Sequence, residues 1–363
     1  MSEVWILGAA GRTGRAIAAE LAMRQIPLVL VGRDAAKLQG VAATAGEARV
    51  QTADSVGAMA AAIAAARPSV VVNTIGPFAE TAAPIARACA PATHYVDIAN
   101  ELDVVLELLA MNDTAVRDGR CIVTGAGWGL VATESVVLKL CEGRPTPARV
   151  RVDNLAYVNQ PGPVGPTVAA SVIDGLAYDA GRIYEDGRLT RVRLGSHRQQ
   201  FTLPDGGTAV TGCAPTGELE AAYRASGAPF VVAGFPAAPG AAAMFAVAAL
   251  LAVPGMRGFA RRRFARLTPP PPKRDVSWAR AVLEWPDGDI QVGWLRAGEG
   301  YDFLAKAAAG VAARLVRGEG RPGAFTPGAL FGPDLAVEAG GTFMLGGAPS
   351  SDADVGTRTV RSS

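Results

Sequence analysis

A glycine-rich loop near the start of the chain constrains the fold more than any other feature. It runs over residues 8–14 as GAAGRTG, directly after the apolar residues 4–7 and at the start of a helical pattern. In such a strand–loop–helix the glycines permit a tight turn, close approach of the backbone to a pyrophosphate, and close packing of the helix. The free N–H groups at the helix start attract phosphate. The predicted dinucleotide-binding residues of this loop are Gly8, Ala10, Gly11, Arg12, Thr13 and Gly14.

Short apolar runs and helical patterns alternate over residues 1–124. The predicted strands are residues 4–7, 28–31, 48–51, 70–74, 94–97 and 121–124, and the predicted helices are residues 12–23, 35–45, 56–66, 80–89 and 102–117. Continuous apolar strands separated by helices are typical of a parallel sheet that is covered on both faces. The pattern predicts an α/β fold, a Rossmann-type doubly wound parallel sheet that binds a dinucleotide.

The pattern changes after residue 124. Strand-like runs occur at 148–157, 192–194, 276–285 and 289–295, and a Trp-Pro-Asp-Gly turn joins the last two. Residues 125–320 are therefore predicted to form a second, α+β domain with a mixed or antiparallel sheet, which binds the substrate and includes a helix at 301–316. A homodimer contact through this domain stays open. Residues 321–347 are predicted to return toward the Rossmann domain, and residues 348–363, which are small and polar, to form a disordered tail.

Composition excludes several functions. The 363 residues carry a net charge of only +2, so no basic field points to nucleic acid. Four separated cysteines without a CxxC pair, and only two histidines, argue against a metal site. The cysteines are typical of buried thiols in a reducing compartment, and the chain begins without a signal-peptide pattern, which favours a cytoplasmic protein.

One uncharged apolar run, residues 241–253, lies between Pro239 and Pro254. It is too short to span a bilayer, so a buried core helix is the favoured interpretation. The alternative is a helix that touches a membrane or an apolar substrate. The substrate expected under the leading functional hypothesis below is a small apolar or amphiphilic molecule.

The end of the second predicted strand indicates which dinucleotide is bound. NAD-specific folds place an acidic residue there to bind the ribose 2′-hydroxyl. This chain has Gly32 followed by Arg33, and an arginine at that point pairs with a 2′-phosphate. The adjacent Asp34 either caps the next helix or contacts a ribose. The pattern favours NADP(H).

The loops after the third and fourth predicted strands complete the cofactor site. Asp54 is expected near the adenine amino group. The segment from residue 73 to residue 77 lies beside the point where the strand order reverses, and it is expected to border the nicotinamide ribose and ring. An alternative for Asn73 is that it is a polar residue that merely ends the strand. The predicted contacts are Asn73, Thr74, Gly76 and Pro77.

Three segments resemble a known family. They are residues 72–78 (VNTIGPF), 84–89 (PIARAC) and 94–101 (HYVDIANE). A Gly-Pro-aromatic loop, a helix ending in Ala-Cys and a Tyr-Val-Asp strand leading to Glu are similar to the saccharopine dehydrogenase-like NADP-binding domain. Residues 298–302 and 323–332 are similar to actinobacterial trans-acting enoyl reductases of lipid and polyketide pathways. The resemblance implies an NADP-dependent oxidoreductase that acts on C–N or C=C bonds.

The segments nearer the substrate depart from the family pattern. Asn100 stands where the family usually has Gly, and residues 125–134 (GAGWGLVATE) replace the usual Gly-Phe-Asp and Pro-Ser-Asp motifs. The resemblance therefore implies the cofactor but not the substrate.

Reduction of a C=N or C=C bond needs hydride and a proton. The sequence contains no Tyr-x-x-x-Lys motif, which disfavours alcohol–ketone chemistry. The leading candidates for the proton donor are Tyr157 and Glu134, followed by His197 and Tyr301, and each also has a purely structural interpretation. In some C–N members of the family the substrate amine itself carries the proton.

The leading functional hypothesis is an NADPH-dependent reductase in a specialised lipid or secondary-metabolite pathway. The alternative is a catalytically silent NADP-binding regulatory or scaffold protein.

Overall fold

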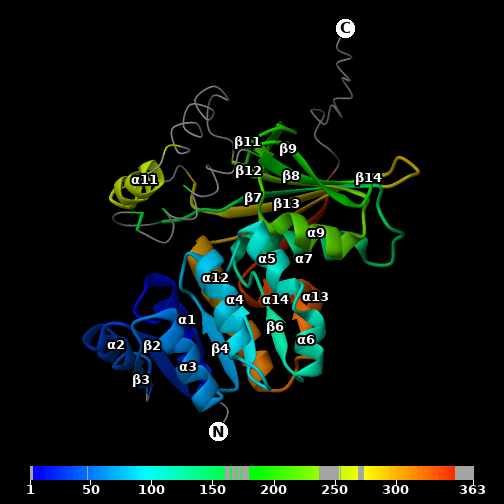
Figure 1. Cartoon of the computed structure of the whole chain (residues 1–363). Helices are drawn as coiled ribbons and strands as arrows, with labels where there is room; N and C mark the ends of the chain where they lie inside the picture. Colours follow the sequence, from blue (N-terminus) through cyan, green and yellow to red (C-terminus); the bar gives the residue numbers. More distant parts are fainter. Residues whose placement is uncertain are drawn as a thin grey trace.

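Two β-sheets organise the computed structural model, one below and one above a layer of helices (Figure 1). The structure describes residues 3–46, 48–159, 164–165, 169, 173, 180–236, 253, 255–268 and 274–347. The helices are α1 (Arg12–Met23), α2 (Ala35–Ala42), α3 (Val56–Ala66), α4 (Phe78–Ala88), α5 (Leu102–Leu109), α6 (Asn112–Arg117), α7 (Trp128–Cys141), α9 (Gly217–Ser226), α11 (Met256–Ala265), α12 (Gly300–Val316), α13 (Pro327–Phe331) and α14 (Asp334–Glu338).

The first sheet is parallel throughout and has the order β3-β2-β1-β4-β5-β6-β15. Its strands are β1 (Val4–Leu7), β2 (Leu28–Gly32), β3 (Arg49–Thr52), β4 (Val70–Asn73), β5 (His94–Asp97), β6 (Cys121–Val123) and β15 (Gly323–Phe325). The order reverses between β1 and β4, where open α/β sheets bind their ligands. The predicted Rossmann-type fold is confirmed.

Alternating side chains of these strands fill two separate cores. Ile6 and Leu30 pack against Ile17 of α1, on the face that also carries α12. Leu7 and Val31 point to the opposite face, where they pack with α3, α4 and α5. Burial on both faces explains why the central strands β1, β2 and β4 have largely apolar sequences.

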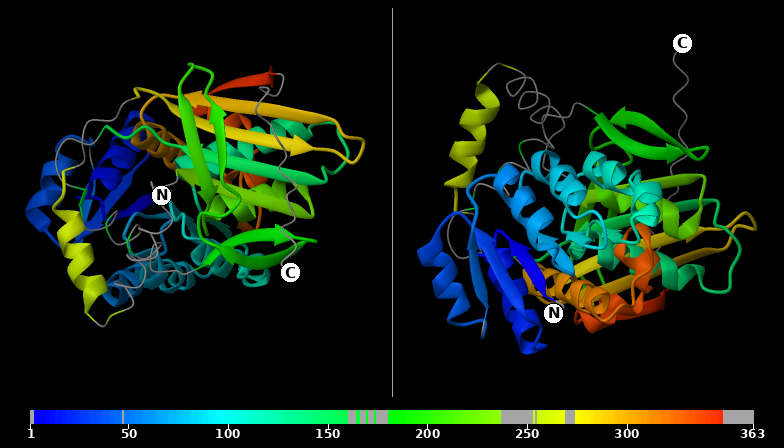
Figure 2. Two further views of the ribbon diagram at one scale, coloured as in Figure 1. Left: turned by 90° about the horizontal axis from the view of Figure 1, so that it is seen from above. Right: turned by 60° about the horizontal axis from the view of Figure 1, so that its bottom comes forward.

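The second sheet is mixed and lies across the top of the molecule (Figures 1 and 2). Its main path is β10-β11-β12-β7-β13-β14-β16, with β8 and β9 attached beside β12. The strands are β7 (Arg149–Leu155), β8 (Ala180–Glu185), β9 (Arg188–Arg193), β10 (Gln199–Thr202), β11 (Thr208–Cys213), β12 (Phe230–Pro236), β13 (Ser277–Glu284), β14 (Ile290–Ala297) and β16 (Thr342–Gly347). Among the described strands of this sheet, only β7 and β12 pair in parallel. The predicted second α+β unit is thus confirmed as a fold class.

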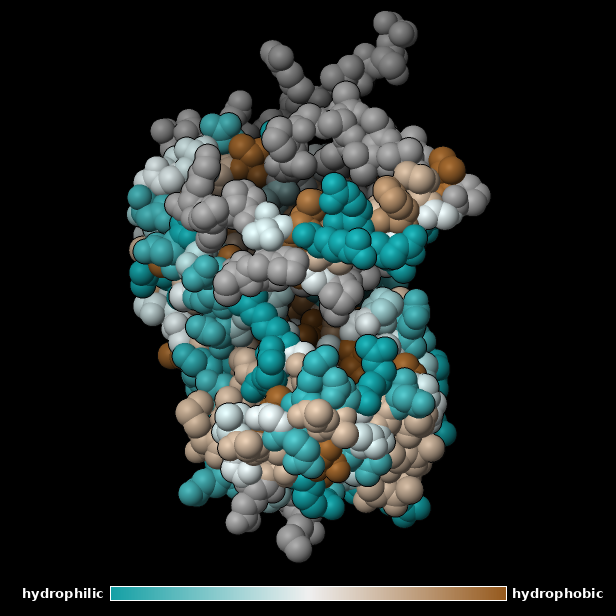
Figure 3. Space-filling model, turned by 90° about the vertical axis from the view of Figure 1, so that its left-hand side faces the viewer, coloured by the Kyte–Doolittle hydropathy of each residue, from teal (hydrophilic) through white to brown (hydrophobic). Residues whose placement is uncertain are grey.

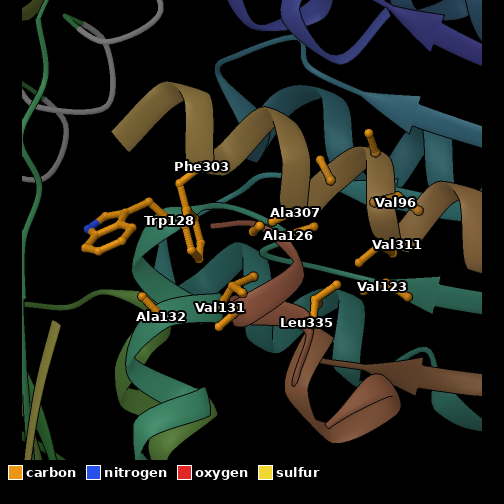
Figure 4. Packing of buried hydrophobic residues seen from close by; sticks show 14 of the residues in the cluster. Val96, Val123, Ala126, Trp128, Val131, Ala132, Phe303, Ala307, Val311 and Leu335 are labelled. Atoms are coloured by element: carbon orange, nitrogen blue, oxygen red, sulfur yellow. The ribbon is translucent and has the colours of Figure 1, made fainter. Parts of the chain in front are cut away.

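Helix α7 joins the two halves. It packs against β13 and β14 of the second sheet, against α9, and against α12, which covers the parallel sheet. Figure 4 shows this shared core, in which Trp128 and Phe303 lie together at the first turns of α7 and α12. Their rings meet edge to face with centroids 4.9 Å apart.

Several predicted elements have other bounds in the structure. The helix predicted over residues 102–117 is divided into α5 and α6, because α6 turns to meet β15, where the Asn112 side chain accepts a hydrogen bond from the Ala324 N–H (3.1 Å). The helix predicted to reach residue 45 ends at Ala42. The strand predicted at residues 192–194 is the end of the longer β9.

The C-terminal part contributes to both sheets. Strand β15 adds to the edge of the parallel sheet at β6, whereas β16 pairs with β14 in the second sheet. Helix α12, which the sequence assigned to the second domain, packs on α1. The domain limits at residues 124 and 320 therefore stay a proposal.

Residues 241–252 of the apolar run and the tail after residue 347 lie outside the described residues. Within the described part of the chain, none of the helices combines the length and the apolar character needed to cross a membrane.

Candidate functional site

The glycine loop has the shape that a pyrophosphate requires. Gly8 has a φ of +80°, and a Cβ there would lie 2.7 Å from Thr74 Oγ1. A Cβ on Gly14 would lie 2.5 Å from the Gly8 carbonyl oxygen and 2.7 Å from Ala9 Cα, both backbone atoms. The Gly11 N–H donates to the Gly8 carbonyl (2.8 Å) and closes the turn. Side chains at the first and third glycines would thus disrupt the turn or separate α1 from it.

The start of α1 carries no side-chain cap. Its N-cap residue is Gly11, which has no side chain that could accept a hydrogen bond from the first turn. The first N–H groups of a helix have no intrahelical partner and form the positive end of its dipole. This helix start can therefore bind an anionic phosphate, and Ala10 and Thr13 lie beside it.

The end of β2 presents a cation. Arg33 is exposed, and the described part of the chain gives it no ion pair. Asp34 is occupied elsewhere, since it is the N-cap of α2 and accepts from the Lys37 N–H (3.1 Å). The alternative in which this carboxylate contacts a ribose is thereby disfavoured. The exposed Asp54 lies near this arginine, because the Ala53 N–H donates to the Gly32 carbonyl (2.9 Å).

Hydrogen bonds to buried groups hold the loop after β4 in place. Asn73 is fully buried, and its amide contacts Thr81 Oγ1 (3.3 Å) and Tyr95 Oη (3.2 Å) while its oxygen accepts from the Ile75 N–H (3.0 Å). Its side chain therefore shapes the loop from beneath instead of facing a ligand. The Thr74 hydroxyl donates to the Leu7 carbonyl (2.7 Å) and ties the loop to β1.

The same loop leads into α4. Gly76 is followed by Pro77, the N-cap residue of α4. These two residues line the entry to the helix, at the carboxyl edge where the predicted nicotinamide site lies.

A buried carboxyl ends β5. Asp97 accepts hydrogen bonds from Tyr95 Oη (3.0 Å), Thr124 Oγ1 (3.0 Å) and the N–H groups of Ala99 (3.1 Å) and Gly125 (2.9 Å). Burial raises its pKa to about 6, while the four hydrogen bonds act in the opposite direction. Asp97 thus connects the ends of β5 and β6 beneath the site.

Arg12 of the glycine loop faces the second half of the chain. Its guanidinium lies 3.3 Å from Glu299 Oε1 and 4.0 Å from the ring centre of Tyr301. Glu299 also accepts from the N–H groups of Tyr301 (2.6 Å), Asp302 (3.0 Å) and Asn159 (3.1 Å). Arg12 therefore links the loop to the start of α12. The predicted pairing of Arg12 with a phosphate would require its guanidinium to be shared with Glu299 or released from it.

Two of the four proton-donor candidates lie beside this contact. Tyr157 follows β7, is half-buried, and its carbonyl accepts from the Gly300 N–H (2.8 Å). Tyr301 stacks on Arg12, and burial raises its pKa. His197 is exposed in the loop between β9 and β10, where its ring lies 6.0 Å from that of Phe230 on the second sheet.

Glu134 is a buried residue that holds two helices together. It is fully buried in α7 and accepts from Thr326 Oγ1 and from the N–H groups of Gly328 (2.8 Å) and Ala329 (3.0 Å) at the start of α13. Burial raises its pKa to about 7 against these hydrogen bonds. The geometry argues against the predicted role as proton donor, because the carboxylate is enclosed and serves to hold α13.

The family of the first domain follows from comparison with known proteins. Residues 4–123 match the model of the saccharopine dehydrogenase NADP-binding domain. The first third of the chain is thus similar to a saccharopine dehydrogenase NADP-binding domain. The cofactor is accordingly NADP(H), and the protein is an NADP-dependent oxidoreductase.

One solved structure shows that the likeness of fold extends beyond this domain. Apo saccharopine dehydrogenase (L-Glu forming) from Saccharomyces cerevisiae matches with a TM-score of 0.60 and 14% identity, covering 96% of this chain and 100% of that one. A metagenomic short-chain oxidoreductase in complex with NADP matches 34% of this chain and 80% of its own, with 22% identity and a TM-score of 0.29. No curated protein sequence matches.

A hollow opens above the half of the molecule that contains the parallel sheet. Figure 3 shows it between the lower and upper halves of the molecule, with apolar side chains at its bottom. The carboxyl ends of the parallel strands face the second sheet on this side (Figure 1). Open α/β sheets bind their ligands outside the carboxyl ends of the strands, which is the side on which the hollow lies.

The sequence did not indicate a buried polar chain beside these strand ends. Trp128 Nε1 donates to Asn154 Oδ1 (2.7 Å), and Asn154 Nδ2 donates to Glu218 Oε1 (2.7 Å). Asn100, which follows β5, lies near the same carboxyl. Asn100 is noticeable in the sequence as a departure from the family, whereas Glu218 gives no signal, because acidic residues are common in the first turn of any helix.

Proposed function

We propose that the chain is an NADPH-dependent reductase that adds hydride to a C=N or C=C bond of a small apolar or amphiphilic molecule, in a specialised lipid or secondary-metabolite pathway. The observation that carries the proposal is the uncapped start of α1 beside the exposed Arg33, at the edge of the sheet that opens into the hollow. The absence of a Tyr-x-x-x-Lys motif from the sequence supports C=N or C=C reduction over alcohol chemistry.

The residues of the loops bind and orient the dinucleotide. Gly8, Gly11 and Gly14 bring backbone N–H groups to the pyrophosphate, as the free helix start requires. Arg33 binds the 2′-phosphate, and Asp54 faces the adenine. When bound, NADPH supplies the hydride at the nicotinamide ring.

The loop after β4 borders the end of the dinucleotide that reacts, the nicotinamide. The Thr74 hydrogen bond to Leu7 fixes this loop, and Gly76 and Pro77 border the nicotinamide. Tyr157 and Tyr301, near the start of α12, are the two candidate donors that lie on the cofactor side of the second domain.

Two linked measurements test the proposal. Calorimetry should show that the purified protein binds NADPH more tightly than NADH, and NADPH should then be consumed in the presence of a panel of cyclic imines and enoyl thioesters. Binding of neither dinucleotide would refute it.

A catalytically silent NADP-binding regulatory or scaffold protein is the second candidate. The observation that favours it is the contact of Arg12 with Glu299 and Tyr301, which holds the start of α12 against the glycine loop. This alternative predicts NADPH binding, no NADPH consumption with either substrate class, and a partner protein that is captured only when NADPH is present.

A further inference from the structure

Helix α11 lies on the outside of the molecule, and none of its 10 residues is buried. Figures 1 and 2 show the helix outside both sheets, on the side that faces the viewer in Figure 3, where the hollow opens. Its end is attached by backbone hydrogen bonds, in which the N–H groups of Val164 and Gly165 donate to the carbonyls of Leu267 (2.9 Å) and Ala265 (3.0 Å). The rest of the helix is therefore open to a partner.

The outward face of α11 carries one aromatic and three basic side chains. They are spaced i, i+3, i+4 and i+7, which places them on one face of the helix, and all four are exposed: Phe259, Arg262, Arg263 and Arg266. The partly covered side chains lie on another side of the helix and include Met256, Ala260 and Phe264. The helix thus presents its arginines to solvent and turns other side chains to the protein.

The positive charge of this face is not neutralised by the protein. Within the described part of the chain, Arg262, Arg263 and Arg266 have no ion pair. The sequence from residue 253 to residue 268 contains five arginines and neither Asp nor Glu, whereas the whole chain has a net charge of only +2. The remainder of the chain is therefore negative, and an anionic partner is attracted to α11 in particular.

Apolar side chains are exposed among these arginines. Phe259 is 55% exposed, and Val253 and Leu267, which lie at the two ends of the helix, are 50% and 44% exposed. Arginine pairs with phosphate through two hydrogen bonds, and an aromatic ring is favourable at the boundary between lipid headgroups and acyl chains. A surface that offers both phosphates and an apolar layer satisfies all of these side chains.

We propose that α11 docks the protein on an anionic lipid surface, with Arg262, Arg263 and Arg266 on the lipid phosphates and Phe259 at the level of the headgroups. A nucleic acid offers the phosphates but no apolar layer for Phe259, so the exposed side chains favour lipid.

Docking through α11 has a consequence for the hollow. The helix lies on the side of the molecule on which the hollow opens (Figures 1 and 3), so the bound protein turns this opening toward the lipid. An amphiphilic substrate would then pass from the lipid surface to the hollow over a short path. Lipid binding itself needs no dinucleotide and does not depend on the proposed reductase function.

The test measures co-sedimentation of the purified protein with vesicles. Wild type should bind vesicles of equal parts phosphatidylcholine and phosphatidylglycerol but not vesicles of phosphatidylcholine alone. The triple variant Arg262→Gln, Arg263→Gln, Arg266→Gln should bind about tenfold more weakly or less, because each arginine near an anionic surface contributes about 1 kcal/mol. Phe259→Ala should weaken binding about threefold or more through the lost apolar contact.

The matched control removes the same charge elsewhere. Arg67, Arg188 and Arg198 are exposed and lie after α3, in β9 and between β9 and β10. The triple variant Arg67→Gln, Arg188→Gln, Arg198→Gln has the same net charge as the α11 variant and should bind the anionic vesicles within about twofold of the wild type. Thermal unfolding verifies that each variant folds.

Three results would overturn the inference. The first is a wild type that does not bind the anionic vesicles. The second is an equal loss of vesicle binding in the two triple variants, which would show that net charge and not α11 is responsible. The third is vesicle binding that does not respond to Phe259→Ala together with equally tight binding of a random-sequence DNA duplex, measured by fluorescence anisotropy, which would show that α11 binds any polyanion.

Discussion

Arg33 is the residue on which the preference for NADPH over NADH depends. It is exposed at the end of β2, and the described part of the chain gives it no ion pair that a 2′-phosphate would have to displace. Hydrogen bonds to charged groups contribute about 1.5–3 kcal/mol, so Arg33→Ala should weaken NADPH binding about tenfold or more and leave NADH binding nearly unchanged. Calorimetry with both dinucleotides measures the two affinities.

Arg49→Ala is the matched control for this prediction. Arg49 starts β3, at the far end of the parallel strands from the glycine loop, and pairs with Glu3. Arg49→Ala should leave the affinities for NADPH and NADH unchanged. Equal losses of NADPH and NADH binding in Arg33→Ala would show that this side chain does not recognise the 2′-phosphate.

At this scale the sequence revealed residue types but not their directions. Gly8 and Gly14 were recognisable because their spacing follows from backbone geometry. Asn73 lies at the end of β4, whereas Glu134 lies in the middle of α7 and not near a helix start. The side chains of both point into the protein, where they bind Tyr95 and Thr326. Direction depends on partners more than 20 residues away, which one sequence does not reveal.

The glycine loop and α1 act as one element, and Gly14 joins them. A Cβ at this position would meet the backbone of Gly8 and Ala9, which cannot move aside as a flexible side chain would. Gly14→Ala should therefore separate α1 from the loop, reducing stability by roughly 1–3 kcal/mol and abolishing measurable NADPH binding. Denaturant unfolding and calorimetry measure the two effects.

Gly57→Ala is the same change of residue type, but we expect it to raise stability where Gly14→Ala lowers it. Gly57 lies in α3 with open space around its Cα, so alanine should stabilise the helix by roughly 0.5–1 kcal/mol. Gly14→Ala that binds NADPH as well as Gly57→Ala does would contradict the close-packing role.

The strands differ in how well the sequence predicted them. Strands β1, β2 and β4 were visible because burial on both faces leaves continuous apolar sequences. The exposed strand β3 was predicted from its place in the alternation of strands and helices. Strands β10, β11 and β16 were missed, since their sequences are short and partly polar and their pairing is set by distant segments. Strand β15 was missed because it is three residues long and pairs with β6 across about half of the chain.

At the scale of the whole molecule, three buried carboxyls couple folding to pH. Asp97 connects β5 and β6, Glu134 holds α13 to α7, and Glu218 lies between α7 and α9. Burial raises the pKa of each, to about 6 for Asp97 and to about 7 for Glu134. These groups lie along the region that joins the two sheets, so their ionisation affects the whole fold.

The sign of the effect follows from proton counts. A carboxyl whose folded pKa exceeds its unfolded value binds more protons in the folded state between the two values. The unfolding free energy should therefore fall as pH rises from about 5 to about 8, by an amount on the order of 2 kcal/mol. Urea unfolding at a series of pH values measures this slope.

Asp97→Asn tests whether the slope comes from these groups. The asparagine oxygen can keep the hydrogen bonds from Ala99, Thr124 and Gly125, and its amide can donate to the Tyr95 hydroxyl oxygen in place of accepting from it. The variant has no carboxyl to titrate, so its unfolding free energy should vary less between about pH 5 and about pH 7 than that of the wild type. A wild-type protein whose stability rises over this range, or a variant with an unchanged slope, would show that Asp97 is ionised in the fold and that its four donors outweigh its burial.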